Sequence, residues 1–425
     1  MSEKGMRILP AKLQGDLTLM PSKSLAHRAI LCAALAEGTS TLAPVQLSED
    51  VAATLDGVRA LGMADVQLRT PQLIVHGGGK GAGARVVQCR ASGSTLRFLL
   101  PLALDGCGPV QFVGTNRLLE RPLTPYRDAF VAQGVRWEQT ATSLTVEGVL
   151  HPGIYRMPGD LSSQFMTGLL LALPRLGGVS RIVCMGEVES RGYIDLTLDI
   201  LRRFGVHASW MEQGVLQMDG HQTYTPAGVE LEGDWSHAAF YLAAGAIGGS
   251  IRMHGLATDS LQGDRAMAEL VQHMGAHVEL VPGGILSTGM VARGIEADLS
   301  QTPDIVPALA VAACAAQGET RLVGASRLRL KECDRIEAMC EGINRLGGSA
   351  TALPDGLSIK GIGHLYGGMV DSYHDHRIAM ALTMAASICT GPVRLAGADS
   401  VRKSAPTFWQ EYRMLGGMAS ECILG

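Results

Sequence analysis

The sequence contains few aromatic and few charged residues. Aromatic side chains make up 4% of the 425 residues and charged side chains 18%, below the roughly 25% charged residues of typical soluble proteins. Helices built from Ala, Leu, Met and Ile with so few charges are buried on most sides. The formal net charge is −4, which does not favour a polyanion-binding protein held by bulk charge. Basic groups must therefore be concentrated locally if the chain binds anions.

Several chemistry-bearing motifs are also missing. The nine cysteines are scattered, without a CxxC pair, and the twelve histidines include no HExxH. This pattern excludes a disulfide framework and indicates a reducing compartment without a zinc site. His374 and His376 stand alone, without Cys or acids at a metal-ligand spacing, so no metal is expected. The sequence contains neither GxxxxGK[ST] nor GxGxxG after a strand, so no cofactor is expected either.

Membrane segments are absent as well. The start, MSEKGMRIL, lacks the apolar run of a signal peptide. No apolar stretch reaches the roughly 18 residues that a bilayer-spanning helix needs. We therefore expect a cytoplasmic protein with no membrane and no nucleic-acid partner.

Glycine is abundant, with 53 residues, and it recurs at intervals of about 70 residues. One series closes amphipathic helices, as expected of a C-cap glycine, and a second series closes apolar helices. The first series is Gly62, Gly134, Gly205, Gly275, Gly347 and Gly416. The second series is Gly38, Gly106, Gly177, Gly248, Gly318 and Gly391. Six similar α/β units of this size predict a symmetric assembly.

Each unit reads as an apolar helix, a short strand, an amphipathic helix, and one or two further strands. Ser48 followed by Glu49 and Asp50 predicts an N-cap with two acids in the first helical turn. Thr124 followed by Pro125 predicts a second N-cap, with proline at the first helical position.

The units divide into two halves. The segment RILPAKLQGDLTLMPSKS before the first unit resembles TPAGVELEGDWSHA before the fourth. Two crossovers are therefore expected, near residues 12–21 and 225–234. We predict one domain from residues 1–20 with 232–425 (units four to six) and another from 21–231 (units one to three).

A polar or charged cluster lies just upstream of each second-series glycine: SKSLAHR, SGSTLR, SSQF, WSHA, DIVPA and DHRIA. These clusters open helices, and helix N-termini favour anions through free N–H groups and a positive dipole end. If the units converge on one cleft, the chain is built to hold a small, highly negative substrate.

The first half supplies cations and neutral donors. Lys23 and Arg28 lie at a helix start, where a cation costs a few tenths of a kcal/mol unless an anion compensates. The alternative is a solvated helix start. Gly93 in SGST permits close backbone approach and is typical of an anion nest, or of an ordinary capped helix. Arg121 before a proline-started helix is either a ligand or a surface arginine.

The second half contains the densest cluster. RLRLKECDRI places Lys331, Glu332 and Arg335 at a helix entrance, where Glu332 among cations can act as an acid or base. Asp304 opens an otherwise uncharged helix, as a site residue or as a plain N-cap. Many cations and few acids at equivalent positions suit a substrate pair with several negative groups.

Nine stretches carry a resemblance to a known family. They are PSKSLAHRA, SGSTLRF, RPL, SSQF, EGDWSHAAFYLAAGAI, PDIVPALAV, RLRLKECDRI, DHRIAM and RKSAPTFW. Across nearly its full length the chain resembles the 5-enolpyruvylshikimate-3-phosphate synthases. The resemblance implies an α/β fold of two similar domains, each with three βαβαββ units packed as an inverted α/β barrel. It also implies an active site in a cleft that closes on substrate.

The resemblance implies transfer of the enolpyruvyl group of phosphoenolpyruvate to the 5-hydroxyl of shikimate 3-phosphate, releasing phosphate. The residues it implies for shikimate 3-phosphate are Lys23, Ser24, Arg28, Ser162, Ser163, Gln164, Ser190, Asp304 and Lys331. Those for phosphoenolpyruvate are Lys23, Gly93, Arg121, Gln164, Arg335, Arg377 and Lys403.

The resemblance also suggests catalytic roles, by addition and elimination through a tetrahedral intermediate. Asp304 is expected to take the hydroxyl proton and Glu332 to protonate the methylene carbon. Lys23 is expected to assist proton movement, with His376 as a further candidate.

The sequence departs from the family pattern at three positions. Phe98 replaces a proline, Arg327 an asparagine, and Cys333 a serine or threonine. Gly93 is retained, which predicts a phosphoenolpyruvate site that accepts glyphosate.

Two alternatives remain. The sister family transfers enolpyruvyl to UDP-N-acetylglucosamine. It has asparagine at the place of Ser24 and cysteine at the place of Asn116, and the nearest cysteine here is Cys107. A non-catalytic scaffold that binds anionic metabolites would not need Glu332 or Asp304. Because both halves of one chain supply the expected site, we predict a monomer.

Overall fold

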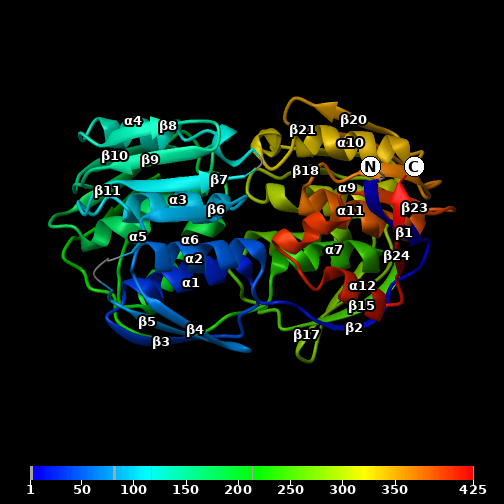
Figure 1. Cartoon of the computed structure of the whole chain (residues 1–425). Coiled ribbons are helices and arrows are strands. Elements are labelled where there is room, and N and C mark those ends of the chain that lie inside the picture. The colour runs from blue at the N-terminus through cyan, green and yellow to red at the C-terminus, as the bar shows by residue number, and fades with distance from the viewer. Residues whose placement is uncertain (1–2, 80–82, 116, 213, 425) are drawn as a thin grey trace. The chain divides into compact units, whose positions relative to one another are not determined.

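The computed structural model describes residues 3–79, 83–115, 117–212 and 214–424. Asn116, used above against the UDP-sugar alternative, lies outside these residues. The chain forms two compact units (Figure 1). Unit 1 comprises Met1–Met20 and Glu232–Gly425, and unit 2 comprises Pro21–Leu231.

Unit 2 contains three four-stranded sheets of one design. In each sheet the first two strands are parallel, and the third and fourth strands are each antiparallel to the strand before them. The strands, in sheet order, are β14 (Gly228–Glu230), β3 (Gly38–Ala43), β5 (Gln72–Gly77) and β4 (Asp65–Arg69); β6 (Val86–Arg90), β7 (Val110–Gly114), β9 (Ser143–Glu147) and β8 (Arg136–Gln139); β10 (Ile154–Pro158), β11 (Ser180–Met185), β13 (Val215–Met218) and β12 (Ser209–Glu212). The helices are α1 (Lys23–Leu35), α2 (Glu49–Ala60), α3 (Gly93–Leu102), α4 (Thr124–Val131), α5 (Ser163–Ala172) and α6 (Arg191–Arg203). A parallel pair needs a crossover, which α3 provides between β6 and β7 and α5 provides between β10 and β11.

Unit 1 repeats this design three more times. Its strands, in sheet order, are β2 (Gln14–Thr18), β15 (Ile247–His254), β17 (Gly284–Met290) and β16 (His277–Val281); β18 (Glu296–Asp298), β19 (Gln317–Val323), β21 (Gly356–Ile362) and β20 (Ala350–Leu353); β22 (Gly368–Asp371), β23 (Val393–Ala396), β1 (Glu3–Leu9) and β24 (Met418–Leu424). Its helices are α7 (Trp235–Ala246), α8 (Ala266–His273), α9 (Val306–Ala315), α10 (Arg335–Arg345), α11 (His376–Ala385) and α12 (Phe408–Met414). The expected α/β class and the repeated βαβαββ order are confirmed.

Two strands, β2 and β14, each pair in one unit although the helix that follows them in the chain belongs to the other unit. β2 immediately precedes α1 of unit 2 but pairs in parallel with β15 of unit 1. β14 precedes α7 of unit 1 but pairs in parallel with β3 of unit 2. The two sequence segments that resemble each other therefore occupy the same position in two different sheets.

The helix boundaries follow local chemistry. All six first-series glycines have positive φ, from 62° to 108°, as the C-cap prediction requires. Ser48 caps α2 by accepting a hydrogen bond from the Val51 amide. The predicted Thr124 cap is wrong, because the Leu123 carbonyl already accepts the Tyr126 and Arg127 amides. The helix consequently begins at Thr124 itself.

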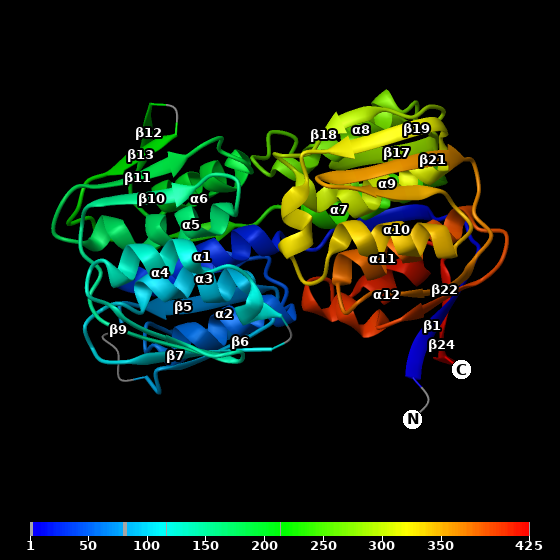
Figure 2. The same cartoon turned by 90° about the horizontal axis from the view of Figure 1, so that it is seen from above.

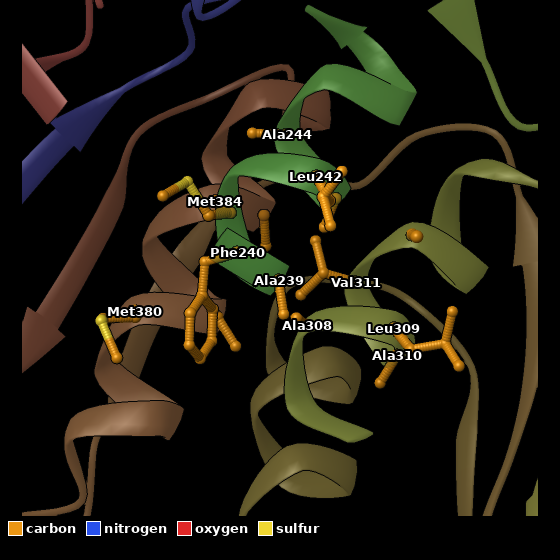
Figure 3. Packing of buried hydrophobic residues seen from close by; sticks show 14 of the residues in the cluster. Ala239, Phe240, Leu242, Ala244, Ala308, Leu309, Ala310, Val311, Met380 and Met384 are labelled. Atoms are coloured by element: carbon orange, nitrogen blue, oxygen red, sulfur yellow. The ribbon is translucent and has the colours of Figure 1, made fainter. Parts of the chain in front are cut away.

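The first helices of the repeats form the interior of each unit. In unit 1, α7, α9 and α11 contact one another (Figure 3). Every residue of α9 is buried, as expected of a helix without charges. Figures 1 and 2 show sheets and helices packed together in each unit, with α10 and α12 turned towards the viewer in Figure 2. Within the described residues, no helix is long and apolar enough to cross a bilayer. This arrangement places the N-termini of the interior helices, with their polar motifs, at one end of each unit.

Candidate active site

Unit 1 gathers most of its predicted site residues around one arginine. The Arg335 side chain, 2% exposed, opens α10 and contacts three carboxylates. Its Nε lies 2.7 Å from Asp375 Oδ2, its Nη1 3.0 Å from Asp304 Oδ1 and its Nη2 2.8 Å from Glu332 Oε2. Burial alone would lower the pKa of Arg335, but these three negative charges outweigh it and raise the pKa. Arg335 therefore fixes the two candidate proton-transfer acids relative to each other.

The Asp304 carboxylate is in contact with three cationic side chains. Asp304 lies in a short 3-10 turn, Pro303–Ile305, that leads into α9. Arg377 donates to its carboxylate at 3.1 Å and to its carbonyl at 3.0 Å, and Lys331 Nζ lies 3.6 Å from its Oδ1. Burial alone would raise the pKa of Asp304, but Arg377, Lys331 and Arg335 hold it well below its ordinary value. The carboxylate is ionised and, with these cations in contact, a weak base.

Two lysines complete this group. Lys403, at the end of a 3-10 helix, lies 3.6 Å from Glu332 Oε1 and is buried. Burial lowers the pKa of Lys331, and the Asp304 charge opposes that effect. Asp304, Lys331, Glu332, Arg335, Arg377 and Lys403 thus form one polar cluster, called here the unit 1 cluster.

His376 is the first residue of α11 and is buried beside this cluster. Its Nδ1 lies 3.7 Å from Asp375 Oδ1. Asp375 caps α11 by accepting the Arg377 amide at 2.8 Å, while its other oxygen binds Arg335. The N-cap carboxylate therefore links the start of α11 to the start of α10.

Sequence reasoning missed Ser236 and Asp264. The Ser236 hydroxyl donates to Asp264 Oδ2, and Asp264 is fully buried. Burial, reinforced by the Asp304 charge, raises the pKa of Asp264 to about 6. Ser236 lies in the WSHA motif and could have been found from its repeat phase. Asp264 lies in a turn, Gly263–Arg265, without any motif of its own.

In unit 2, Arg28 is a buried cation with neutral partners. Its Nε donates to Thr197 Oγ1 at 2.8 Å, its Nη1 to the Ser24 carbonyl at 2.7 Å, and its Nη2 to Thr167 and the Tyr193 carbonyl. None of its partners among the described residues is a carboxylate. Burial lowers its pKa to about 10, so it remains charged at neutral pH. This arrangement is suited to an external anion.

Gly93 lies where three polar side chains meet. A Cβ at this position would lie 2.9 Å from Arg97 Nη1, and 3.3 Å from both Arg121 Nη1 and Gln164 Oε1. Gln164 is fixed there, since it accepts from Arg97 at 2.8 Å and donates to Ser94 at 3.0 Å. Arg97 belongs to the predicted motif, but the sequence did not identify it as a site residue.

Lys23 has an acidic partner that the sequence did not predict. Its Nζ lies 2.8 Å from Asp50 Oδ2, in the first turn of α2. Asp50 therefore compensates a cation that otherwise opposes the α1 dipole.

The predicted serines lie at helix starts. Ser162 caps α5 by accepting the Gln164 amide at 3.3 Å, and Ser163 is the buried first residue of that helix. Ser190 precedes α6 in the left-handed conformation, with φ 52°, and is buried. A non-glycine residue held in this conformation is typical of functional sites. Thus unit 2 brings Gly93, Arg121 and Gln164 together and surrounds Arg28 with neutral acceptors.

The three departures from the family pattern are also buried. Phe98 lies 5.2 Å below the Arg28 guanidinium, and Arg327 donates to the Ser300 carbonyl. Cys333 Sγ lies 3.8 Å from Asp375 Oδ2, and burial raises its pKa. Its thiol is therefore a poor nucleophile. Within the described residues, no three His, Cys, Asp or Glu side chains are grouped to hold a metal.

Comparisons with known proteins point to one family. A family model described as EPSP synthase (3-phosphoshikimate 1-carboxyvinyltransferase) matches residues 9–412. A 3-phosphoshikimate 1-carboxyvinyltransferase of Clostridium perfringens is 42% identical over 98% of this chain and 99% of its own. One of Clostridium novyi is 39% identical over 99% of this chain and 100% of its own.

Solved structures give the same result. EPSP synthase from Acinetobacter baumannii matches with a TM-score of 0.80 and 27% identity, over 99% of this chain and 100% of that one. The enolpyruvyl transferase NikO from Streptomyces tendae has a TM-score of 0.81 over the full length of both chains. At 16% identity, the second match concerns the fold alone.

Proposed function

The chain belongs to the EPSP synthase (3-phosphoshikimate 1-carboxyvinyltransferase) family, and from this membership we propose the reaction that it catalyses. The enolpyruvyl group of phosphoenolpyruvate is transferred to the 5-hydroxyl of shikimate 3-phosphate, and phosphate is released. The observation that carries the proposal is the pairing of two acids, Asp304 and Glu332, with the same buried arginine, Arg335. A scaffold that only binds anions has no need of two carboxylates among its cations.

We propose that both units act on one substrate pair. The residues assigned to shikimate 3-phosphate are Lys23, Ser24, Arg28, Ser162, Ser163, Gln164, Ser190, Asp304 and Lys331. Those assigned to phosphoenolpyruvate are Lys23, Gly93, Arg121, Gln164, Arg335, Arg377 and Lys403. The assignment is supported by buried cations in both units, of which Arg28 has only neutral partners among the described residues.

The chemistry follows as an addition and an elimination. The 5-hydroxyl oxygen attacks C2 of phosphoenolpyruvate while Asp304 accepts its proton, and Glu332 delivers a proton to C3. This step gives a tetrahedral intermediate that still carries the phosphate. Loss of a proton from the new methyl group and departure of phosphate restore the double bond. Lys23 and His376 are assigned to proton movement between these groups.

The contacts of Asp304 suggest how substrate activates it. Three cations keep its pKa low in this structure. Phosphoenolpyruvate brings a phosphate and a carboxylate that compete for Arg377 and Arg335. When these arginines turn to the substrate, the stabilisation of the Asp304 carboxylate falls and its basicity rises towards that of a useful general base.

The enzyme is proposed to work as a monomer in the cytoplasm. One chain carries the unit 1 cluster and the residues assigned in unit 2, so a second copy is not needed to complete the set of assigned residues. The proposed substrates are small phosphorylated metabolites.

The test follows phosphate release from phosphoenolpyruvate, with either shikimate 3-phosphate or UDP-N-acetylglucosamine as acceptor. We expect release only with shikimate 3-phosphate, and a loss of about 100-fold or more in kcat for Glu332→Gln. Glu337→Gln is the matched control, because Glu337 lies nearby, in the first turn of α10, but its side chain is exposed and contacts only Arg329 among the described residues. Release with the UDP-sugar would assign the chain to the sister activity, and no release with either acceptor would favour the binding scaffold.

A further inference from the structure

Unit 2 has one hydroxyl at the same place in each of its three repeats. The second helix of each repeat carries it, eight residues before the glycine that closes the helix. The residues are Thr54, Tyr126 and Thr197, all fully buried.

Each hydroxyl lies between two first helices. Thr54 Oγ1 lies 2.7 Å from His27 Nδ1 of α1 and 2.7 Å from Thr95 Oγ1 of α3. The Tyr126 hydroxyl lies 3.0 Å from the carbonyl of Arg97 in α3 and 2.7 Å from that of Phe165 in α5. The same role recurs between α5 and α1.

Thr197 fills that third place. Its Oγ1 lies 3.0 Å from Thr167 Oγ1 of α5 and 2.8 Å from Arg28 Nε of α1. The three hydroxyls therefore form a pseudo-threefold set around α1, α3 and α5.

Unit 1 has no hydroxyl at this phase. In unit 1 the residues eight positions before the first-series glycines are Met267, Met339 and Phe408. All three are fully buried. The repeat fold is therefore compatible with an apolar side chain at this position. In unit 2 the hydroxyls must serve the polar groups that they contact.

One arrangement of the protons allows all the hydrogen bonds around Thr197 to form together. Thr197 donates its own proton to the Tyr193 carbonyl, at 2.9 Å. In this arrangement the Thr197 oxygen accepts from Arg28 Nε and from the Thr167 hydroxyl. Thr167 in turn accepts from Arg28 Nη2, at 3.3 Å. The two threonines thus act as oriented acceptors for one guanidinium.

Among the described residues, these contacts use four of the five N–H groups of Arg28. Of its five N–H groups, one on Nε, two on Nη2 and one on Nη1 donate to neutral oxygens. One N–H on Nη1 remains. Because the acceptors are neutral, the full positive charge also remains, and a buried charge attracts an anion more strongly than an exposed one.

We propose that Thr197 is a positioning residue that orients Arg28 so that its remaining N–H meets an anionic group of shikimate 3-phosphate. The inference rests on the proposed function of Arg28 as a ligand of that substrate. A carboxylate at position 197 would hold the guanidinium equally well but would neutralise its charge. A hydroxyl supplies the geometry without that loss.

The first test compares Thr197→Val with Thr197→Ser. Valine keeps the shape and removes the acceptor, whereas serine keeps the hydroxyl. We expect Thr197→Val to raise the KM for shikimate 3-phosphate about tenfold, the effect of about 1.4 kcal/mol. The KM for phosphoenolpyruvate and kcat should change less than about threefold, and Thr197→Ser should resemble the wild type.

Thr383→Val is the matched control. Thr383 is a buried threonine of α11 whose hydroxyl donates only to the Ala379 carbonyl of its own helix among the described residues. This variant should leave all three kinetic constants unchanged. Equal changes in both KM values, or a serine variant as impaired as the valine one, would overturn the proposal. If Thr197→Val does not fold, Thr167→Val removes the second oriented acceptor and is expected to behave in the same way.

A second measurement does not depend on activity. The Arg28 Nε–H signal in a ¹⁵N spectrum, assigned by its absence in Arg28→Lys, should be protected from exchange in the wild type and lose protection in Thr197→Val. Unchanged protection would overturn the inference. Protection that is lost as expected, in a wild-type protein that releases no phosphate, would reject the proposed function while leaving the orientation of Arg28 by Thr197 established.

Discussion

Gly93 approaches Arg97 so closely that a Cβ at position 93 would lie 2.9 Å from Arg97 Nη1. The same Cβ would lie 3.3 Å from Arg121 and Gln164. Three side chains that point to one place leave room for a ligand only because residue 93 has no side chain.

Gly93→Ala is therefore expected to impair phosphoenolpyruvate binding. The new methyl group must displace Arg97, so the KM for phosphoenolpyruvate should rise about tenfold, while the KM for shikimate 3-phosphate changes little. The wild type should be inhibited by glyphosate at concentrations near those of the substrate, and Gly93→Ala should be less sensitive. Steady-state kinetics with and without glyphosate check both statements.

Gly228→Ala is the matched control, since a Cβ there meets nothing within 4 Å. It should retain wild-type kinetics. A Gly93→Ala enzyme with unchanged KM and unchanged glyphosate sensitivity would show that phosphoenolpyruvate binds elsewhere.

The repeats were predictable because a helix C-cap has a local signature. A glycine such as Gly62 reports its positive φ directly in the sequence. The strand exchange was not predictable to the same degree. β14 has only three residues, and its partner β3 is formed by residues nearly 190 positions earlier in the chain. Nothing local distinguishes that pairing from a pairing within its own repeat.

The site was predictable where residues lie in motifs at helix starts. Lys331, Glu332 and Arg335 are consecutive or nearly so, and the structure brings them together. Asp264 and Thr197 lie outside such motifs, and their roles arise from tertiary contacts with distant residues. The six-fold phase of the repeats was the one additional signal that could have identified Ser236.

Asp304→Asn tests the proposed general base. Asparagine keeps the size and the hydrogen-bonding oxygen but cannot take a proton or neutralise the surrounding cations. We expect kcat to fall about 100-fold or more, with intact folding by circular dichroism. Glu296→Gln, at an exposed position of β18, should have no effect. If Asp304→Asn turns over at the wild-type rate, another group must act as the general base.

Glu411 is expected to make stability depend on pH. It is buried and contacts His237 and Tyr241, each at 2.7 Å. Burial alone would raise the pKa of Glu411, but the His237 charge and the hydrogen bonds lower it to about 2. Because folding lowers this pKa, the ionised Glu411 stabilises the folded protein at pH values above its pKa in the unfolded chain, near 4.5. That stabilisation is lost as the pH falls towards 2.

Glu411→Gln should therefore lower the free energy of unfolding by about 3 kcal/mol at neutral pH. The difference from the wild type should shrink as the pH falls from about 4.5 towards 2. Urea unfolding at several pH values measures both. A constant difference across this range would mean that lost packing, not ionisation, causes the effect.

Asp264 is expected to show the opposite pH dependence. Its pKa is raised to about 6 by burial and by the Asp304 charge, against the partial opposition of Arg377 and the Ser236 hydroxyl. Between pH 3.8, its ordinary value, and about 6, the folded state binds the proton more tightly than the unfolded state. Stability is therefore greatest below this window and falls as the pH rises through it.

Asp264→Asn removes this cost, because the amide does not ionise and still accepts from Ser236. We expect the variant to be more stable than the wild type at pH 8, by at least about 1 kcal/mol, and closer to it at pH 4. Thermal or urea unfolding at the two pH values checks the sign. If the variant is also slower in turnover at pH 8, the wild type keeps a destabilising buried charge near Asp304 because the reaction uses it. A variant that is less stable at pH 8 than at pH 4, relative to the wild type, would show that folding lowers the pKa of Asp264 instead of raising it.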